Sequence, residues 1–207
     1  MTAMDAPNDT GRKRLIRRVL LLSWLSLAYL TIEGGVALFA GIVANSPALV
    51  GFAIDSIIEG LASVIIVWRF TGARAYSDAA ERKAQKLVAL QFFILAPYVA
   101  YESVNALARR DAPHESLLGI VLAVTSLVVM YVLGRAKIGL SDQLDSPATR
   151  GEGRQNILCA YLSGALLIGL GGNALLGWWW LDPLVGLLIA AVAVQEGREA
   201  WSGEEAE

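Results

Sequence analysis

The sequence predicts an all-α, polytopic membrane protein with six transmembrane helices, and two features of its composition support this. The 207 residues are 56% hydrophobic and 17% charged, with a mean hydropathy of +0.53, whereas soluble domains carry about 25% charged residues. Six apolar runs are each close to the ~20 residues that a helix needs to cross a bilayer. Backbone groups in lipid must be hydrogen-bonded internally, so these runs are expected to be helices. They cover residues 15–42, 46–69, 84–108, 116–134, 154–176 and 179–199.

The distribution of basic residues predicts the orientation. Of the 17 Lys and Arg residues, only Arg109 and Arg110 lie in the connections predicted for one side. The others precede or open the first run, lie between the second and third or the fourth and fifth runs, or lie at the C-terminus, and we expect them in loops and tails. Cytoplasmic segments carry the excess of Lys and Arg, so both termini are expected in the cytoplasm.

The chain is expected to form one domain with two short tails. Residues 1–11 are predicted to be a disordered cytoplasmic tail, 12–201 the six-helix transmembrane domain, and 202–207 an acidic C-terminal tail. Basic residues are not interleaved with aromatic residues in the sequence, which argues against a nucleic-acid partner. The single histidine, His114, lies in a predicted loop, so no catalytic arrangement of histidines is expected and the protein is predicted not to be an enzyme.

Two acids interrupt the second apolar run. Asp55 and Glu59 lie in "GFAIDSIIEGLAS", residues 51–63, and their four-residue spacing places them on one helix face. An ionised carboxylate near the bilayer centre costs about 2.5–3.5 kcal/mol on insertion scales, and two of them repel each other unless a cation or proton lies between them. A divalent cation suits carboxylate oxygens. The alternatives are a neutral pair or an ion pair with Arg; the second is weak because no Arg or Lys is expected deep in any span.

Polar residues in the first and fifth runs extend this hypothesis. Glu33 is expected at a depth similar to that of Glu59, where it either supports the site, relays protons, or is a hydrogen-bonded packing acid. In the fifth run, one face carries Gln155, Cys159 and Ser163, and Glu152 and Asn156 flank it. A thiolate is a soft metal ligand and an amide a weak one, although a buried cysteine can also serve as a small apolar side chain.

Two segments resemble the cation diffusion facilitator (cation efflux) family. They are "NSPALVGFAIDSIIEGLASVIIVWRF", residues 45–70, and "GWWWLDPLVGLLIA", residues 177–190, and the likeness extends over about residues 14–200. The family has six transmembrane helices and exports divalent ions such as Zn²⁺, Mn²⁺, Fe²⁺, Co²⁺ or Cd²⁺, usually against protons and as homodimers. The resemblance implies that Asp55 and Glu59 are metal ligands and that the protein is similar to a short bacterial branch, in the inner (plasma) membrane, without a cytoplasmic C-terminal domain.

The sequence departs from the family pattern at the ligand positions. Zinc-specific members often carry His at one position of the pair in the second helix, where this chain has two acids. A second His/Asp pair is expected in the fifth helix, but counting back from Asp182 gives Gln155 and Cys159, or Asn156 and Ala160.

These residues lead to one main hypothesis and one alternative. In the first, the protein is a proton-coupled efflux transporter in which Asp55 and Glu59 bind the metal, Cys159 and Gln155 complete the shell, and Glu33, Glu152 or Asn156 support it or relay protons. The metal cation is then the substrate, with no organic cofactor, and membrane lipid and a second copy of the chain are the partners. In the alternative, the chain is a membrane metal-binding or regulatory subunit that does not transport.

Overall fold

All elements of the described structure are helical, as predicted. The computed structural model describes residues 6–43, 47–110 and 117–202, and it contains no strand in these ranges. His114, residues 1–5 of the predicted N-terminal tail and residues 203–207 of the acidic tail lie outside the described residues. The elements are α1 (Ala6–Val43), α2 (Pro47–Arg69), the short 3-10 helix η1 (Gly72–Tyr76), α3 (Asp78–Arg109), α4 (Leu117–Leu144), α5 (Pro147–Leu176) and α6 (Leu181–Ser202).

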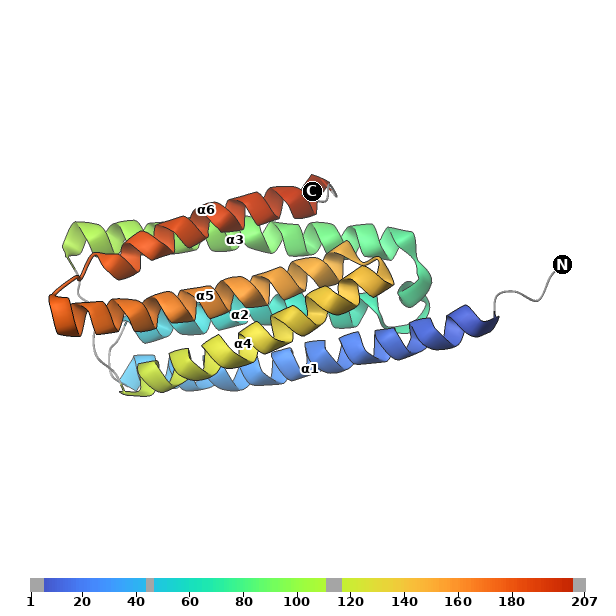
Figure 1. The fold of residues 1–207 in the computed structure, drawn as a ribbon, viewed down its shortest axis with the longest axis horizontal. Helices are drawn as coiled ribbons and strands as arrows, with labels where there is room; N and C mark the ends of the chain where they lie inside the picture. Colours follow the sequence, from blue (N-terminus) through green and yellow to red (C-terminus); the bar gives the residue numbers. More distant parts are fainter. Residues whose placement is uncertain (1–5, 44–46, 111–116, 203–207) are drawn as a thin grey trace.

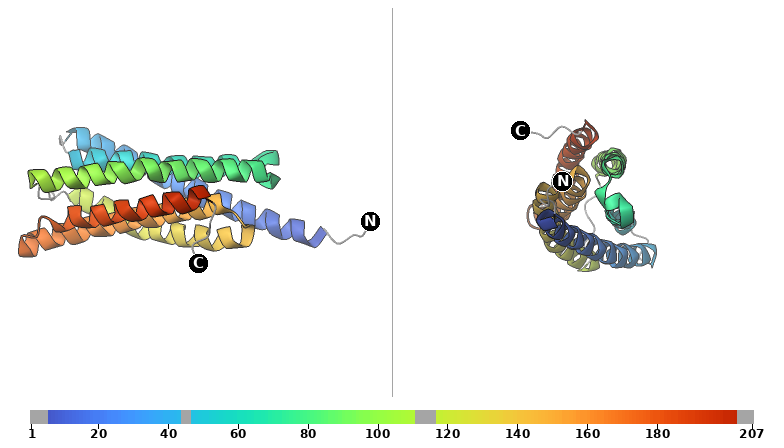
Figure 2. Two further views of the ribbon diagram at one scale, coloured as in Figure 1. Left: turned by 90° about the horizontal axis from the view of Figure 1, so that it is seen from above. Right: turned by 90° about the vertical axis from the view of Figure 1, so that its right-hand side faces the viewer.

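The six α-helices form an elongated bundle in which successive helices are antiparallel (Figure 1). The closest packing is between α1 and α2, between α4 and α5, and between α3 and α6. Helix α2 also packs against α3 and α5, and Figure 2 shows the six helices end-on. The start of α1, the connection between α2 and α3 and the connection between α4 and α5 lie towards the same end of the bundle. This is the end that the basic residues predict to be cytoplasmic, and we refer to it as the basic end.

The apolar surface of the bundle fits a membrane environment. Four helices are long and apolar enough to cross a bilayer within the described residues, over Gly11–Ala40, Gly51–Arg69, Asp78–Arg109 and Leu117–Leu144. That α5 and α6 also cross, and the direction in which the termini face, remain predictions. Large apolar side chains are widely exposed on the outside while many polar side chains are buried, and extended apolar surfaces mark contacts with membranes or proteins. Examples of the exposed set are Leu21, Ile32, Phe39, Leu61, Val132 and Leu188.

Several helices are longer than the hydropathy predicts. Helix α1 begins at Ala6, and α4 and α5 fill most of the expected loop between residues 134 and 154. Asp145, with a φ of 51°, ends α4. Ser146 then caps α5 by accepting a hydrogen bond from the backbone of Thr149 at 3.2 Å, and Pro147 occupies the first helical position, where its missing N–H is not needed. Hydropathy detected the apolar part of each helix and not its polar extension.

The expectation that the basic residues lie in loops is therefore wrong for many of them. Within the described residues the helices contain, among others, Arg69, Arg82, Lys83, Lys86, Arg135, Lys137 and Arg150. Lys137 is fully buried in α4, which also contradicts the expectation that no cation lies deep among the helices. The reason is that a helix continues through charged residues where they face solvent, as at Arg82 and Arg135, or where a buried partner accepts the charge, as Glu152 does for Lys137.

Glu81 connects three helices at the basic end. Its Oε2 accepts a hydrogen bond from Nε of Arg69, at the end of α2, at 2.5 Å. Its Oε1 accepts from the hydroxyl of Ser146 and from the backbone N–H of Ala148, both at 2.9 Å. A carboxylate at the N-terminus of α5 satisfies a backbone donor that would otherwise be unpaired. Glu81 therefore fixes the end of α2 relative to the start of α5, the two helices that carry the candidate site.

Helices α4 and α5 approach each other closely at two glycines. A Cβ atom on Gly134 would lie 2.7 Å from the carbonyl oxygen of Gly153, and one on Gly153 would lie 3.0 Å from that of Gly134. Small residues at such crossings allow helix backbones to come into contact in membranes. This close contact sets the distance between the buried side chains of α4 and those of α5.

The orientation can be tested with reporter fusions. Fusions after residues 75, 145 and 205 are expected to report a cytoplasmic location, and a fusion after residue 112 an external one, because the Lys and Arg residues concentrate at the basic end. Paired alkaline phosphatase and fluorescent-protein reporters would measure this. A cytoplasmic signal at residue 112 would contradict the six-span topology.

Candidate metal centre

Helix α2 places Asp55 and Glu59 inside the bundle. The two side chains lie one helical turn apart on the face directed away from lipid, and they are 8% and 1% exposed. Helix α2 is apolar around them and is covered by α1, α3 and α5. The pair is therefore buried, as its four-residue spacing in an apolar helix indicated.

Helix α5 brings Cys159 to this pair. One ligand atom each from Asp55, Glu59 and Cys159 lies within 4.8 Å of the other two, and Cys159 is a free, buried thiol. Zinc–oxygen and zinc–sulfur bonds of about 2.0–2.3 Å would draw three such atoms closer together by a small inward movement. The three side chains thus have the composition and the spacing of a site for one divalent cation.

Unsatisfied polar atoms extend from this cluster along both helices. Buried atoms without a hydrogen-bond partner in the described structure include one carboxylate oxygen of Asp55, both of Glu59 and both polar side-chain atoms of Gln155. The hydroxyl groups of Ser63 and Ser163 are in the same state. Buried polar groups are normally hydrogen-bonded, so these atoms leave hydrogen-bonding and ligand capacity unused in this part of the bundle.

The unsatisfied residues follow a simple spacing. On α2 they are Asp55, Glu59 and Ser63, and on α5 Gln155 and Ser163 flank the cysteine, again four residues apart along the chain. The two helices are antiparallel, so two polar faces meet along the α2–α5 contact. Ser63 was not predicted, although it is the next position on the face that the two acids define.

Glu33 lies beside this cluster and is already hydrogen-bonded. Its Oε1 accepts a hydrogen bond from the hydroxyl of Tyr29 at 2.8 Å, and its Oε2 accepts one from the hydroxyl of Ser56 at 3.1 Å. The side chain is 3% exposed, and it is not among the three ligand atoms that lie together. Glu33 therefore has the contacts of a packing acid next to the site, and a proton relay through it is left as a proposal.

Glu152 and Asn156 face a different part of the bundle. Glu152 accepts hydrogen bonds from Nζ of Lys137 at 2.7 Å and from the hydroxyl of Ser23 at 2.8 Å. The amide nitrogen of Asn156 donates to the hydroxyl of Ser26 at 3.3 Å, and Lys137 donates to the same hydroxyl at 2.6 Å. These five residues, which we call the Lys137 cluster, join α1, α4 and α5.

Lys137 is a buried charged residue that the sequence did not predict. It was expected in a loop, yet both it and Glu152 are completely buried as an ion pair. The signal was the buried face of α4, on which Ser126, Met130 and Leu133 follow each other at helical spacing and which continues to Lys137. The apolar run ends near residue 134, so hydropathy alone does not place Lys137 on this buried face.

Residues 23–202, which include α2 and α5, match the cation efflux transmembrane domain. This chain belongs to the cation efflux family. The predicted family is thereby confirmed, over a range that contains all members of the metal centre and of the Lys137 cluster.

Two relatives share the domain at low identity. Transmembrane protein 163 of Xenopus laevis is 24% identical over 185 residues, which cover 87% of this cation efflux chain and 65% of the relative. An uncharacterized transporter of Synechocystis sp. is 25% identical over 165 residues, which cover 74% of this chain and 52% of that protein. The chain thus spans about half to two thirds of the length of these relatives.

The Lys137 cluster predicts a sharp effect on stability. Replacing Lys137 by Met leaves the Glu152 charge buried without its partner, which costs about 3–5 kcal/mol, whereas replacing both residues by apolar ones of similar size is often close to neutral. We expect Lys137→Met to lower the midpoint of thermal unfolding in detergent, and Lys137→Met/Glu152→Met to restore most of the loss. Equal destabilisation by the single and the double substitution would contradict a mutual charge pairing.

Proposed function

We propose that this member of the cation efflux family is a divalent metal cation efflux transporter whose substrate binds between α2 and α5. The observation that supports this most strongly is the row of buried, unsatisfied ligand atoms centred on Asp55, Glu59 and Cys159. Two carboxylates and a thiol that form no salt bridge within the described residues are poorly suited to a structural core, and they are suited to hold a dehydrated cation in transit. This function requires no catalytic residues and no organic cofactor.

The ligand set favours borderline metal ions. Carboxylate oxygens accept hard and borderline cations, and a thiolate strengthens the preference for softer ions. The amide oxygen of Gln155, one turn from Cys159 on α5, would add a neutral fourth ligand without adding charge. We therefore propose Zn²⁺, Cd²⁺ and Co²⁺ as better substrates than Mn²⁺, which prefers oxygen ligands alone.

The substrate can be tested through its ligands. Asp55→Asn and Glu59→Gln each remove a charged oxygen ligand while keeping the side-chain volume. Substitutions of residues that only contact metal ligands lower affinity or activity by about 10–100-fold. We expect each of these ligand substitutions to lower metal flux and metal affinity by at least as much. Flux into proteoliposomes of purified protein, measured for Zn²⁺, Cd²⁺, Co²⁺ and Mn²⁺, would provide the values.

Glu102→Gln provides the matched control. Glu102 is an exposed acid on α3, so removing its charge should leave metal flux at the wild-type level. Wild-type flux in Asp55→Asn would show that the metal does not bind at this carboxylate. A different outcome would support the second candidate function, a membrane metal-binding or regulatory subunit. In that case the wild-type chain would bind metal without transporting it, and Asp55→Asn would lose the metal affinity.

Proton coupling follows from the same carboxylates. A bound divalent cation favours both carboxylates ionised, whereas at low pH protons occupy the oxygens that the metal needs. Metal binding to Asp55 and Glu59 would therefore release protons, and the same competition on the other side of the membrane would exchange them for metal. Glu33, with its hydrogen bonds to Tyr29 and Ser56, is positioned to take part in that relay.

The competition has a defined sign. Metal affinity is expected to fall as the pH is lowered, by about tenfold per pH unit for each proton that the metal displaces. Flux at a fixed metal gradient should rise when the side that receives the metal is the more acidic. Isothermal titration against pH and proteoliposome flux with an imposed pH difference would measure the two effects. An affinity independent of pH, or flux indifferent to the gradient, would contradict antiport.

The surroundings of the transporter are also proposals. The apolar outer surface and the basic end suit a multi-pass protein of a bacterial inner (plasma) membrane, with membrane lipid as its immediate partner. A homodimer is proposed from the family to which the chain belongs, and cross-linking in native membranes would test it.

A further inference from the structure

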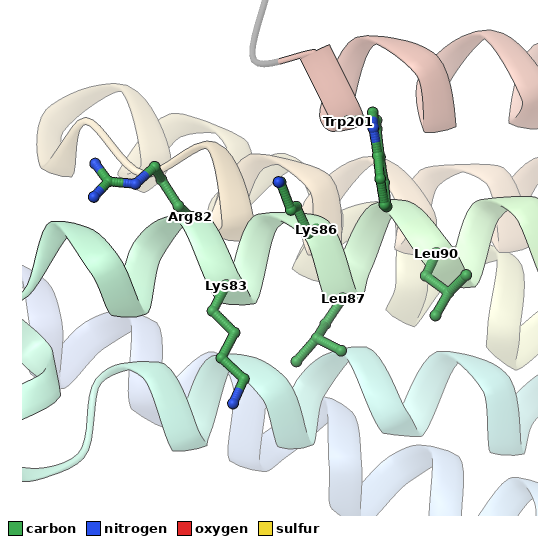
Figure 3. Close-up of a pocket in the computed structure, with 6 residues that line it drawn as sticks. All are labelled: Arg82, Lys83, Lys86, Leu87, Leu90 and Trp201. Carbon is green, nitrogen blue, oxygen red and sulfur yellow. The ribbon is translucent and has the colours of Figure 1, made fainter.

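A pocket at the basic end combines positive charge with an apolar floor. It has a volume of about 420 Å³ and is formed by the first half of α3 and the last turn of α6 (Figure 3). Its lining consists of three cations, two leucines and one tryptophan: Arg82, Lys83, Lys86, Leu87, Leu90 and Trp201. It is far along the chain from the metal ligands and shares no residue with them.

Within the described residues, no acidic side chain neutralises the cations of the pocket. None of the lining residues is acidic, and none of the three cations is in an ion pair within the described part of the chain. The nearby acids of α6 are engaged elsewhere, because Glu196 and Glu199 accept hydrogen bonds from Arg154 at 2.6 and 2.7 Å. Arg82 and Lys86 lie four residues apart on α3, where like charges repel each other, so an anion bound between them would relieve this repulsion.

Aromatic rings hold two of these cations at the edge of the bundle. Nζ of Lys86 lies 5.5 Å from the ring centre of Trp201, and Nζ of Lys83 lies 5.4 Å from that of Trp68, within the range of cation–π contacts. The end of α6 is fixed on α3 by the side-chain amide of Gln85, which donates to the carbonyl oxygen of Ala200 at 2.6 Å. The pocket is therefore preformed.

The order of residues along α3 matches the cross-section of a lipid leaflet. Arg82 lies nearest the basic end, and Leu90 lies about 12 Å further along the helix at 1.5 Å per residue. The headgroup layer on each side of a bilayer is about 5–8 Å thick. When the cations lie at headgroup level, Leu87 and Leu90 lie at the level of the acyl chains, and Trp201 lies at the interface, where tryptophan is enriched.

We propose that this pocket binds one phospholipid with an anionic headgroup, with the lipid phosphate between Arg82 and Lys86 and an acyl chain along Leu87 and Leu90. Charge complementarity selects an anion, and the adjoining exposed leucines select one that carries a hydrocarbon chain over a free phosphate ion. The site joins α3 to α6 and is independent of metal binding, so it goes beyond the proposed transport function.

The test compares two double substitutions that remove equal charge from the full chain. Arg82→Gln/Lys86→Gln changes the pocket, and Arg17→Gln/Arg18→Gln removes two exposed cations from α1 towards the same end of the bundle. Native mass spectrometry in neutral detergent would count phosphatidylglycerol and phosphatidylcholine bound to each protein. Quenching of Trp201 by acyl-brominated phosphatidylglycerol, with Trp201→Phe as reference, would locate the lipid.

The expected result is a preference of the wild-type chain for phosphatidylglycerol over phosphatidylcholine. This preference should be reduced about 30-fold in Arg82→Gln/Lys86→Gln and retained in Arg17→Gln/Arg18→Gln.

Equal losses of this preference in both variants would overturn the proposal in favour of diffuse surface attraction. Displacement of the lipid by inorganic phosphate at equal concentration would indicate a free-anion site. Loss of a dimer in the pocket variant, with Trp201 unquenched in the wild type, would assign the surface to a second copy. The single substitution Lys86→Gln, at an exposed position, provides the comparison should the double variant not fold.

Discussion

The contact between α2 and α5 is the feature on which the rest of the site depends. It places two carboxylates from one helix opposite a thiol and an amide from the other, and within the described residues neither carboxylate forms a salt bridge with a cationic side chain. Such an arrangement is stable only with a guest that supplies positive charge, either a metal ion or protons. The proposed binding of the cation and its proposed exchange for protons would therefore both depend on this one contact.

The bundle contains a second buried polar group with the opposite character. In the Lys137 cluster the ammonium and carboxylate groups are paired, and the neighbouring hydroxyl and amide groups supply further hydrogen bonds. It needs no guest, and it holds α1, α4 and α5 together. Glu81 does the same at the basic end for α2, α3 and α5. These two satisfied networks fix the helices around the unsatisfied one, so the candidate metal centre is the part of the interior whose contacts would change if the proposed metal bound.

The surface of the bundle continues this division. Its apolar sides suit contact with hydrocarbon, while the pocket at the basic end presents Lys83 and Lys86, which lie over tryptophan rings and form no ion pair within the described residues. An anionic lipid at this end would contact α3 and α6 together, and these helices pack along the side of α2 and α5. Lipid composition and metal binding would then act on neighbouring helices of one bundle, although through separate residues.

The sequence by itself determined the fold class and half of the site. Hydropathy marks the apolar lengths, and the 3.6-residue period of a helix places Asp55 and Glu59 on one face whatever surrounds them. Counting along the sequence left two pairs open on α5, Gln155 with Cys159 or Asn156 with Ala160, and only the tertiary structure brings Cys159 to the two acids. Which face of α5 meets α2 depends on side-chain packing across helices such as that at Gly134 and Gly153. The same holds for Lys137. A lysine at the end of an apolar run reads as a loop residue, and its burial becomes possible only because the turn after α4 returns Glu152 to its side.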